Sequence, residues 1–368
     1  MPQEIDMATH AQRHRLPAPP RSAFRHALVT AVLLMTGCAS PQWKAEPVYF
    51  PPPPSSPHVV HLKSFNNLDA LVPSRPTFGD LLRGGPVRPF VETPAGIAYQ
   101  NGHLYVCDTA LRTVHDWDLA SGQAMRLGTS GEGELVTPVA VAVDQRGTVY
   151  VADTGRGEIV SFDTSGTAGQ VFKVPDRDGY RPVAVTVSGE ELLVADVTGA
   201  QIDAFSTADG RLTRIIAASG ADQQFFPMGL AVEATGRTYV ADMMGGRVLV
   251  FGSDQTLTQA IGQRGDRYGD MGQPRHLAVG PDGVIFVADA EFALVHLFNG
   301  EGQLLMLLGG PQDQPGGTPL PVGMAIAPTL PDRLASLVPA DFNAHYFLFV
   351  SNSVGSRRIS LYAIGERR

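Results

Sequence analysis

The tetrapeptide Tyr150-Val151-Ala152-Asp153 decides the fold, because close copies of it recur along the chain. Four further copies end in aspartate, at residues 105–108, 193–196, 239–242 and 286–289, and a sixth, at 348–352, ends in asparagine. A proline lies upstream of each copy, by 11 or 12 positions in the first five units and by 27 in the sixth, and these prolines are Pro94, Pro138, Pro182, Pro227, Pro274 and Pro321. Successive prolines are 44 to 47 residues apart. A nearly constant period of this length indicates a repeat protein, here with six units.

The second unit shows what one repeat contains. Residues 139–143 are apolar at every position, which is typical of a strand buried on both faces. A turn at 144–147 leads to a second strand at 148–152, and residues 158–162 alternate as a third strand. A more polar fourth strand is expected at 169–173. Four short antiparallel strands make the blade of a β-propeller.

The sixth unit ends one strand short. It reaches Arg368 just past its third strand, whereas the alternating segment 58–65 near the N-terminus has no unit of its own. Placing that segment as the outer strand of blade six completes the count and leaves no open sheet edge. The prediction is therefore an all-β, six-bladed β-propeller of four-stranded antiparallel blades, with the ring closed by an N-terminal strand.

The predicted organisation along the chain has five parts. A signal peptide at 1–37 is followed by a Pro-rich tether at 38–57, the closing strand at 58–66, a connector at 67–92 and six blades at 93–368. The last blade carries an insertion at 328–344, which we expect to be a long hydrophobic loop that could cap the channel mouth.

The N-terminus has the features of an export signal. Basic residues precede an apolar run, 27–35, that is too short to span a bilayer. The run ends in Met35-Thr36-Gly37-Cys38-Ala39-Ser40, which resembles a bacterial lipoprotein cleavage box, with Met35 where leucine is usual. The resemblance implies that Cys38 is acylated and anchors the chain, and Ala39 after it favours the outer membrane facing the periplasm. An ordinary signal peptide, cut at small residues, is the alternative.

Composition narrows the partners. Only 17% of the residues are charged, the formal net charge is −8, and no basic stripe is present. Nucleic acid is therefore not expected as a partner. Cys107 is the one cysteine besides Cys38, and it lies in a predicted strand, so we expect no intramolecular disulfide.

The repeated unit resembles a known family. Its pattern is Pro-x-(Gly/Ala)-apolar-Ala-Val, then Tyr-Val-Ala-Asp, then Arg-(Val/Ile)-x-apolar-Phe, and residues 227–251 match it best, with Arg247 and Val248 in the basic-apolar position. This pattern resembles the NHL repeat, and the chain from 49 to 366 resembles bacterial six-bladed NHL-type propeller lipoproteins. The resemblance implies the fold and leaves the activity open, because one propeller architecture hosts unrelated functions.

The repeated acidic residues could suggest a metal-binding site, but a structural role explains them better. Each closes a second strand at a turn, where its side chain is expected to accept backbone N–H bonds. We assign this structural turn role to Asp108, Asp153, Asp196, Asp242, Asp289 and Asn352.

Enzymes related to this repeat suggest an alternative function. Peptide-amidating lyases and gluconolactonase-like propellers hold a metal in the central channel, whereas here only His276 lies at the start of an inner strand. Zinc needs three or four convergent ligands. We therefore expect no metal or other cofactor and no catalytic residue, with a channel calcium or zinc kept as the alternative.

Residues flanking the inner-strand prolines should face one mouth of the channel. The candidate binding residues at this mouth are Arg181, Arg275, His276, Thr93, Thr137, Phe226 and Gln273. They would give a locally basic contact site, since loops at the rim of a scaffold commonly bind. The expected function is a non-catalytic binding scaffold for an envelope protein, peptide or glycan, and the alternative is a metal-dependent lyase or lactonase-like enzyme.

Overall fold

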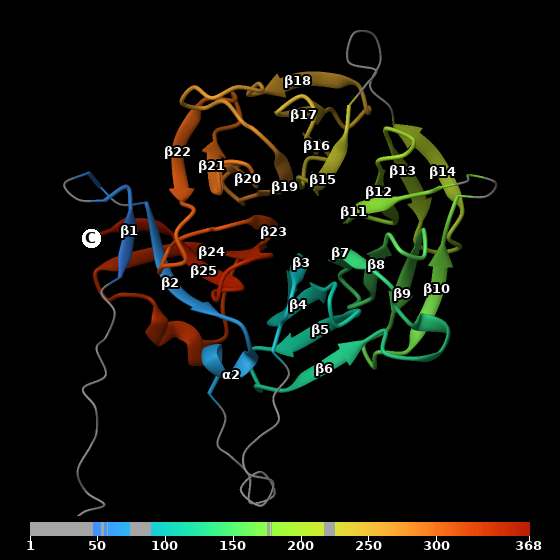
Figure 1. Ribbon diagram of the computed structural model, residues 1–368, viewed down its shortest axis with the longest axis horizontal. Coiled ribbons are helices and arrows are strands. Elements are labelled where there is room, and N and C mark those ends of the chain that lie inside the picture. Colours follow the sequence, from blue (N-terminus) through green and yellow to red (C-terminus); the bar gives the residue numbers. More distant parts are fainter. Residues whose placement is uncertain are drawn as a thin grey trace, which may run out of the picture. The chain divides into compact units, whose positions relative to one another are not determined.

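Six antiparallel sheets stand around a central axis, and the strand that follows each repeat's opening proline is innermost (Figure 1). The computed structural model describes residues 47–52, 55–56, 58–73, 90–174, 177, 179–216 and 225–368. The expected signal peptide, Cys38 and most of the connector lie outside the described residues. Residues Pro47–Arg368 form one unit.

Blades one to five each contain four strands in sequence order. Blade one comprises β3 (Pro94–Gln100), β4 (His103–Asp108), β5 (Thr113–Asp118) and β6 (Ala124–Leu127), and blade two comprises β7 (Pro138–Val143), β8 (Val149–Asp153), β9 (Glu158–Phe162) and β10 (Ala168–Phe172). Blade three comprises β11 (Pro182–Ser188), β12 (Glu191–Asp196), β13 (Gln201–Ser206) and β14 (Leu212–Ile216). Blade four comprises β15 (Pro227–Val232), β16 (Thr238–Asp242), β17 (Arg247–Phe251) and β18 (Leu257–Ile261), and blade five comprises β19 (Pro274–Val279), β20 (Ile285–Asp289), β21 (Leu294–Phe298) and β22 (Leu304–Gly309).

Blade six joins the two ends of the described unit. Its sheet order is β1-β2-β25-β24-β23, built from β23 (Pro321–Ala327), β24 (Phe342–Asn352), β25 (Ile359–Arg367), β2 (Val59–Phe65) and β1 (Val48–Phe50). β2 pairs antiparallel with β25, from Val59 opposite Ile364 to Phe65 opposite Ile359. The six-bladed ring and its closure by an N-terminal strand are confirmed.

β1 is a fifth strand that the sequence analysis had placed in the tether. Its three residues, Val-Tyr-Phe, are strong strand formers, and Tyr49 pairs with Val60 of β2. The Tyr49 hydroxyl donates to Asp341 at 3.0 Å, and its ring lies 6.3 Å from that of Phe342. The chain is therefore held on the propeller from Val48 onward, ten residues earlier than the expected closing strand.

Short helices occupy the connections. α2 (Leu68–Leu71) follows the closing strand, η1 (Gly131–Gly133) lies between the first two blades, and η3 (Asp332–Leu337) lies in the insertion of blade six. None of the helices in the described ranges is long and apolar enough to cross a membrane. The insertion is shorter than expected, because β24 already begins at Phe342 and pairs there with Arg367.

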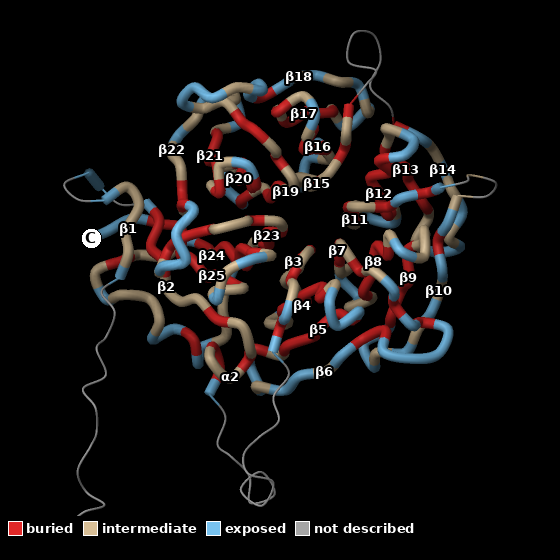
Figure 2. Tube along the Cα trace, viewed as in Figure 1, coloured by how far each residue is buried: buried red, intermediate tan, exposed pale blue. Residues whose placement is uncertain are grey.

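The core lies between neighbouring sheets, so buried residues form bands along the middle strands (Figure 2). The inner strands converge on the axis and come very close together. A Cβ on Gly96 would stand 2.6 Å from the Ala140 Cα, and one on Gly229 would stand 2.7 Å from the His276 Cα. This crowding explains why the repeat has glycine or alanine two residues after each opening proline, except in blade five.

Ring closure gives the first prediction. Phe65 ends the closing strand and is buried at 3% exposure against the Trp117 ring, 6.2 Å away. Phe65→Ala should lower the free energy of unfolding by about 3–5 kcal/mol, because it leaves a cavity where blades six and one meet. Denaturant titration measures the loss. Phe90→Ala is the matched control, since Phe90 is 52% exposed and should lose little; equal losses for both would contradict the closing role of β2.

Candidate functional site

The repeated acidic side chains are occupied by backbone hydrogen bonds. Asp153 accepts N–H bonds from Val136 at 2.6 Å and Thr137 at 2.8 Å, just before the inner strand of its blade. It also accepts from Gly155 and Arg156 in the turn that follows it. Each such aspartate therefore ties the start of its inner strand to the turn after its second strand. Asp108 and Asp289 make the same four-bond arrangement.

A histidine or arginine side chain lies beside most of these buried aspartates. His115 lies 3.4 Å from Asp108 and His296 lies 3.5 Å from Asp289, all four being buried. Burial opposes ionisation of Asp108, but hydrogen bonds from His115 and from backbone amides outweigh it and lower its pKa to about 2. These carboxylates are committed to the fold, and they leave little capacity for a ligand.

Asn352 fills the sixth position with weaker bonding. Its amide donates to the Arg357 carbonyl at 3.4 Å, and its own side-chain oxygen, although buried, finds no partner among the described residues. An amide carries no charge that would need compensation at this buried site.

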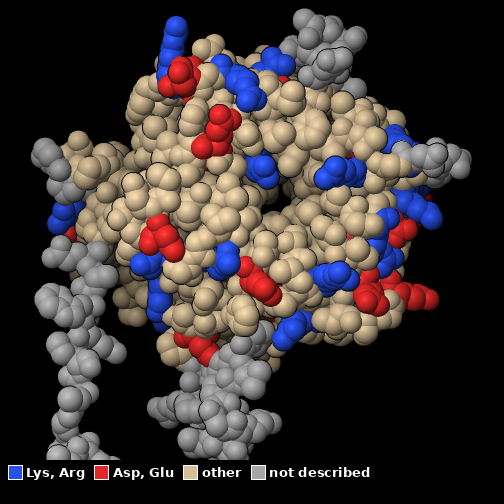
Figure 3. All heavy atoms as spheres, in the orientation of Figure 1, with Lys and Arg blue, Asp and Glu red and all other residues tan. Residues whose placement is uncertain are grey.

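The predicted mouth residues lie on the face that carries these aspartate turns. Thr93, Thr137, Arg181, Phe226 and Gln273 each donate a backbone N–H to the aspartate of their blade. On the face seen in Figure 3, basic side chains stand around the central opening with acidic ones between them. This face therefore carries both positively and negatively charged side chains.

The structure brings only some of these residues together. Thr137 and Arg181 share a cleft of about 650 Å³ between blades two and three with Arg156, Arg177 and Tyr180. Sequence reasoning missed these last three, because they follow the repeated aspartate or precede the inner strand at positions without a repeat signature. Arg156 bonds to Glu158 and to two carbonyls, while Arg177 bridges the buried Asp196 and Asp203. Both therefore serve the fold.

The remaining candidates do not line that cleft. Thr93 lies at the start of blade one, Phe226 at the start of blade four, and Gln273, Arg275 and His276 at the start of blade five. Arg275 approaches Gln273 at 3.5 Å. His276 faces the central channel, and its Nδ1 accepts the backbone N–H of Met324 at 3.3 Å. Burial lowers the pKa of His276 to about 4.

The central channel has a volume of about 360 Å³, and most of the residues around it are apolar, although the surface that they expose to the channel is more polar than apolar. Its wall consists of inner-strand residues such as Val141, Val185, Leu230, Leu277 and Met324. Among the residues that the structure describes, no group of three or more His, Cys, Asp or Glu side chains is placed to hold a metal ion.

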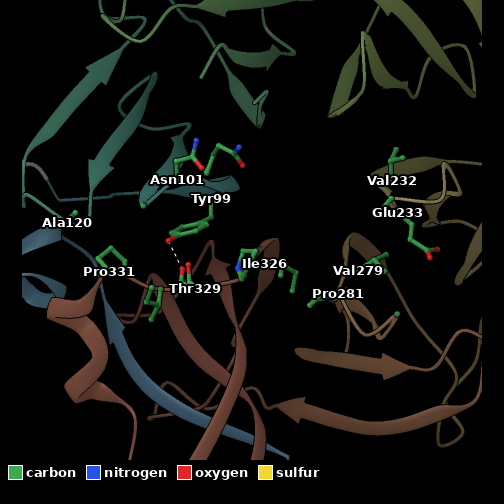
Figure 4. A pocket seen from close by; sticks show the side chains of 17 residues that line it. Tyr99, Asn101, Ala120, Val232, Glu233, Val279, Pro281, Ile326, Thr329 and Pro331 are labelled. Carbon is green, nitrogen blue, oxygen red and sulfur yellow. Dashed lines mark hydrogen bonds between the residues drawn. The ribbon is translucent and has the colours of Figure 1, made fainter. Parts of the chain in front are cut away.

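A larger pocket opens at the other ends of the inner strands, where the sequence analysis did not place candidate residues. It has a volume of about 920 Å³ and is walled by the hairpins of blades one, four and five and by the insertion of blade six (Figure 4). The insertion supplies Pro328, Thr329, Leu330 and Pro331. The Tyr99 hydroxyl donates to the Thr329 carbonyl at 2.7 Å and so fixes this wall to blade one.

The pocket combines apolar walls with one charge. Val232, Val279, Ile326 and Leu330 line it, and Glu233 is the one charged side chain among its described lining residues. The Glu233 carboxylate accepts a hydrogen bond from Tyr239 at 2.8 Å, which fixes one of its oxygens. The break in the period at 328–344 was the sequence signal for this pocket.

Comparison with known proteins supports the fold. No protein-family model matches the chain, and a search of curated proteins found no relative. Among solved structures, the calcium-binding protein regucalcin from Agrobacterium tumefaciens is similar with a TM-score of 0.53 and 14% identity, covering 75% of this chain and 92% of that one. A gluconolactonase from Xanthomonas campestris has a TM-score of 0.52 and 16% identity, covering 84% and 89%. A catalytically inactive virginiamycin B lyase from Staphylococcus aureus, solved with quinupristin, has a TM-score of 0.51 and 12% identity, covering 74% and 95%.

Identities this low show a shared six-bladed propeller and no more. The NHL-type repeat and the lipoprotein signal stay predictions from the sequence.

The channel histidine predicts a pH dependence of stability. Below its ordinary pKa of 6.5 His276 is protonated in the unfolded chain, whereas in the folded protein it stays neutral down to about pH 4. The free energy of unfolding should therefore fall as the pH drops through this window, by up to about 1.4 kcal/mol per unit. His61 adds a similar slope, since burial and the nearby Arg357 charge lower its pKa to about 4.

The variant His276→Gln isolates the channel histidine. It keeps an acceptor for the Met324 N–H but has no proton to bind in this range. Denaturant titrations at several pH values between 6.5 and 4 should show a shallower loss for the variant than for the parent protein. Parallel curves would mean that His276 is not buried in its neutral form.

Proposed function

We propose that this protein is an exported, lipid-anchored propeller that binds a peptide segment of an envelope partner, without catalysis, in the pocket of Figure 4. The observation that carries the proposal is the pocket wall built by residues 328–331, which departs from the sixfold repeat. Loops that leave a rigid scaffold are where binding sites commonly form. The export and anchoring parts rest on the signal-like segment that ends in Cys38.

The chemistry of the pocket favours a peptide over a glycan. Its apolar walls suit a side chain such as leucine or valine, whose burial contributes about 1.5–3 kcal/mol. Glu233 suits a basic group on the ligand, because hydrogen bonds between a charged donor and a carboxylate are stronger than those between neutral groups. An aromatic ring with free faces would favour a sugar, but the Tyr99 ring already stacks on Phe349, with centroids 5.9 Å apart and planes 21° from parallel. One face of the Tyr99 ring is therefore covered.

A metal-dependent lyase or lactonase-like enzyme is the alternative. Two solved structures with the same fold support this alternative, because one is a virginiamycin B lyase and the other a gluconolactonase. Such an enzyme needs three or more ligand-type side chains converging on the axis. In the described wall of the channel, His276 is the one side chain of the His, Cys, Asp or Glu type.

Site-specific cross-linking tests the binding proposal. A photo-reactive residue at Ala234, an exposed hairpin position that lines the pocket, should give a discrete adduct with one envelope protein in cells. The matched control is Ala208, exposed in a hairpin of blade three that does not line the pocket. Adducts of equal yield at both positions, or adducts with glycan alone, would refute a peptide site.

The charge of the pocket gives a second test. Glu233→Gln should weaken partner binding about ten- to a hundredfold, because one charge-assisted hydrogen bond contributes about 1.5–3 kcal/mol. Titration of the purified partner segment, identified by cross-linking, measures the affinity. Glu301→Gln, in an exposed hairpin of blade five outside the pocket, should leave it unchanged. If the affinity of the Glu233→Gln variant equals that of the parent protein, the ligand does not place a basic group at Glu233.

A further inference from the structure

A groove on the rim of the propeller exposes apolar side chains between blades five and six. It has a volume of about 800 Å³, and its apolar lining includes Leu305 of the outer strand β22, Phe50 of β1 and Tyr268 from the loop before β19. Leu305 is 52% exposed and Tyr268 is 79% exposed. Isolated apolar residues on a surface are ordinary, but here several gather in one concave site.

Two of the other blades have a polar residue at the position of Leu305, whereas blades one and two have Met125 and Gly169 there. Leu304 pairs with Phe298 as Leu212 pairs with Phe205 and Leu257 with Phe251, so the residues that follow them are equivalent. In blades three and four the equivalent residues are Thr213 and Thr258, whose hydroxyls donate to carbonyls of the neighbouring strand at 3.0 Å. Blade five has a leucine at this position in place of a hydrogen-bonded threonine, and the leucine side chain is half exposed.

The length of the chain before β1 places this rim close to the anchor. Nine residues separate Cys38 from Val48. Fully extended, ten residue steps reach at most about 35 Å. The strand Val48–Phe50 is fixed on blade six (Figure 1). Phe50 is one of the residues that line the groove. The rim that holds the groove therefore cannot move far from the surface into which an acyl chain on Cys38 inserts.

We propose that this groove docks on the lipid surface, with Leu305 reaching the acyl boundary, Tyr268 lying at the level of the headgroups and the partly buried Phe50 forming the apolar floor behind them. The inference rests on the proposed lipid anchor at Cys38. Tyrosine suits this position because its ring is apolar and its hydroxyl polar, which is why it is enriched at membrane interfaces. The contact adds a second, weaker attachment to the acyl chain, and two attachments hold a protein more stably than one. The channel axis then lies along the membrane plane.

Fluorescence quenching by brominated lipid tests the contact. The full acylated chain with Leu305→Cys, labelled with a polarity-sensitive dye, is reconstituted into vesicles of phosphatidylethanolamine and phosphatidylglycerol. The native Cys107 is completely buried and should not react. The label at 305 should shift to the blue and lose intensity with brominated lipid. Ile215→Cys is the matched control, because Ile215 is 49% exposed on the outer strand β14 of blade three and should show neither change.

Two controls separate this inference from the anchor on which it rests. Loss of membrane association in a Cys38→Ala variant supports the anchor, whereas association unchanged by that replacement refutes it. If the acylated protein binds vesicles and the 305 label is not quenched, the docking surface is refuted while the anchor stands. A blue shift that depends on protein concentration and not on brominated lipid would assign the groove to a second copy of the chain, and would also overturn the proposal.

Discussion

Pairing of β2 with β25 is the interaction on which the rest of the structure depends. It joins the first and last segments of the described unit and leaves blade six without an unpaired third strand. The same region packs the closing strand, α2, η3 and blade one into one hydrophobic cluster, with Phe65, Trp117 and Leu334 among its members. Arg333 of the insertion also donates to the Ala120 carbonyl of blade one at 2.9 Å. Closure of the ring thus holds the insertion in place, and the insertion forms one wall of the pocket.

The two ends of the channel have different roles. At one end the repeated aspartates accept hydrogen bonds from backbone amides, and in several blades a histidine or arginine side chain lies next to the carboxylate. The side chains at this end therefore hold each blade together. At the other end the hairpins of blades one, four and five are short and meet an irregular insertion. Binding is expected where the repeat is broken, because a strictly periodic ring presents the same features at every blade and offers no unique site.

The sequence predicts the ring well because the ring is periodic. Each opening proline, each apolar inner strand and each strand-ending aspartate repeats, so an error in one unit is corrected by the others, and even the closing strand follows from counting. The pocket and β1 have no such redundancy. They depend on single contacts between remote residues, such as Tyr99 with Thr329 and Tyr49 with Asp341, which lie 230 and 292 positions apart. The predicted binding role of the channel mouth stays a prediction, and the cleft that Arg181 shares with Thr137 contains neither Arg275 nor His276.

A propeller that binds a peptide and one that runs metal chemistry in its channel would share this architecture and differ in what the axis holds. The described channel wall favours the first, because His276 is the one side chain of the His, Cys, Asp or Glu type in it. Metal analysis by plasma mass spectrometry of the purified chain from residue 39 to 368, after mild dialysis, distinguishes them most directly. The account predicts calcium and zinc far below one ion per chain. Near-stoichiometric calcium or zinc that survives dialysis would contradict the binding scaffold and favour the enzyme.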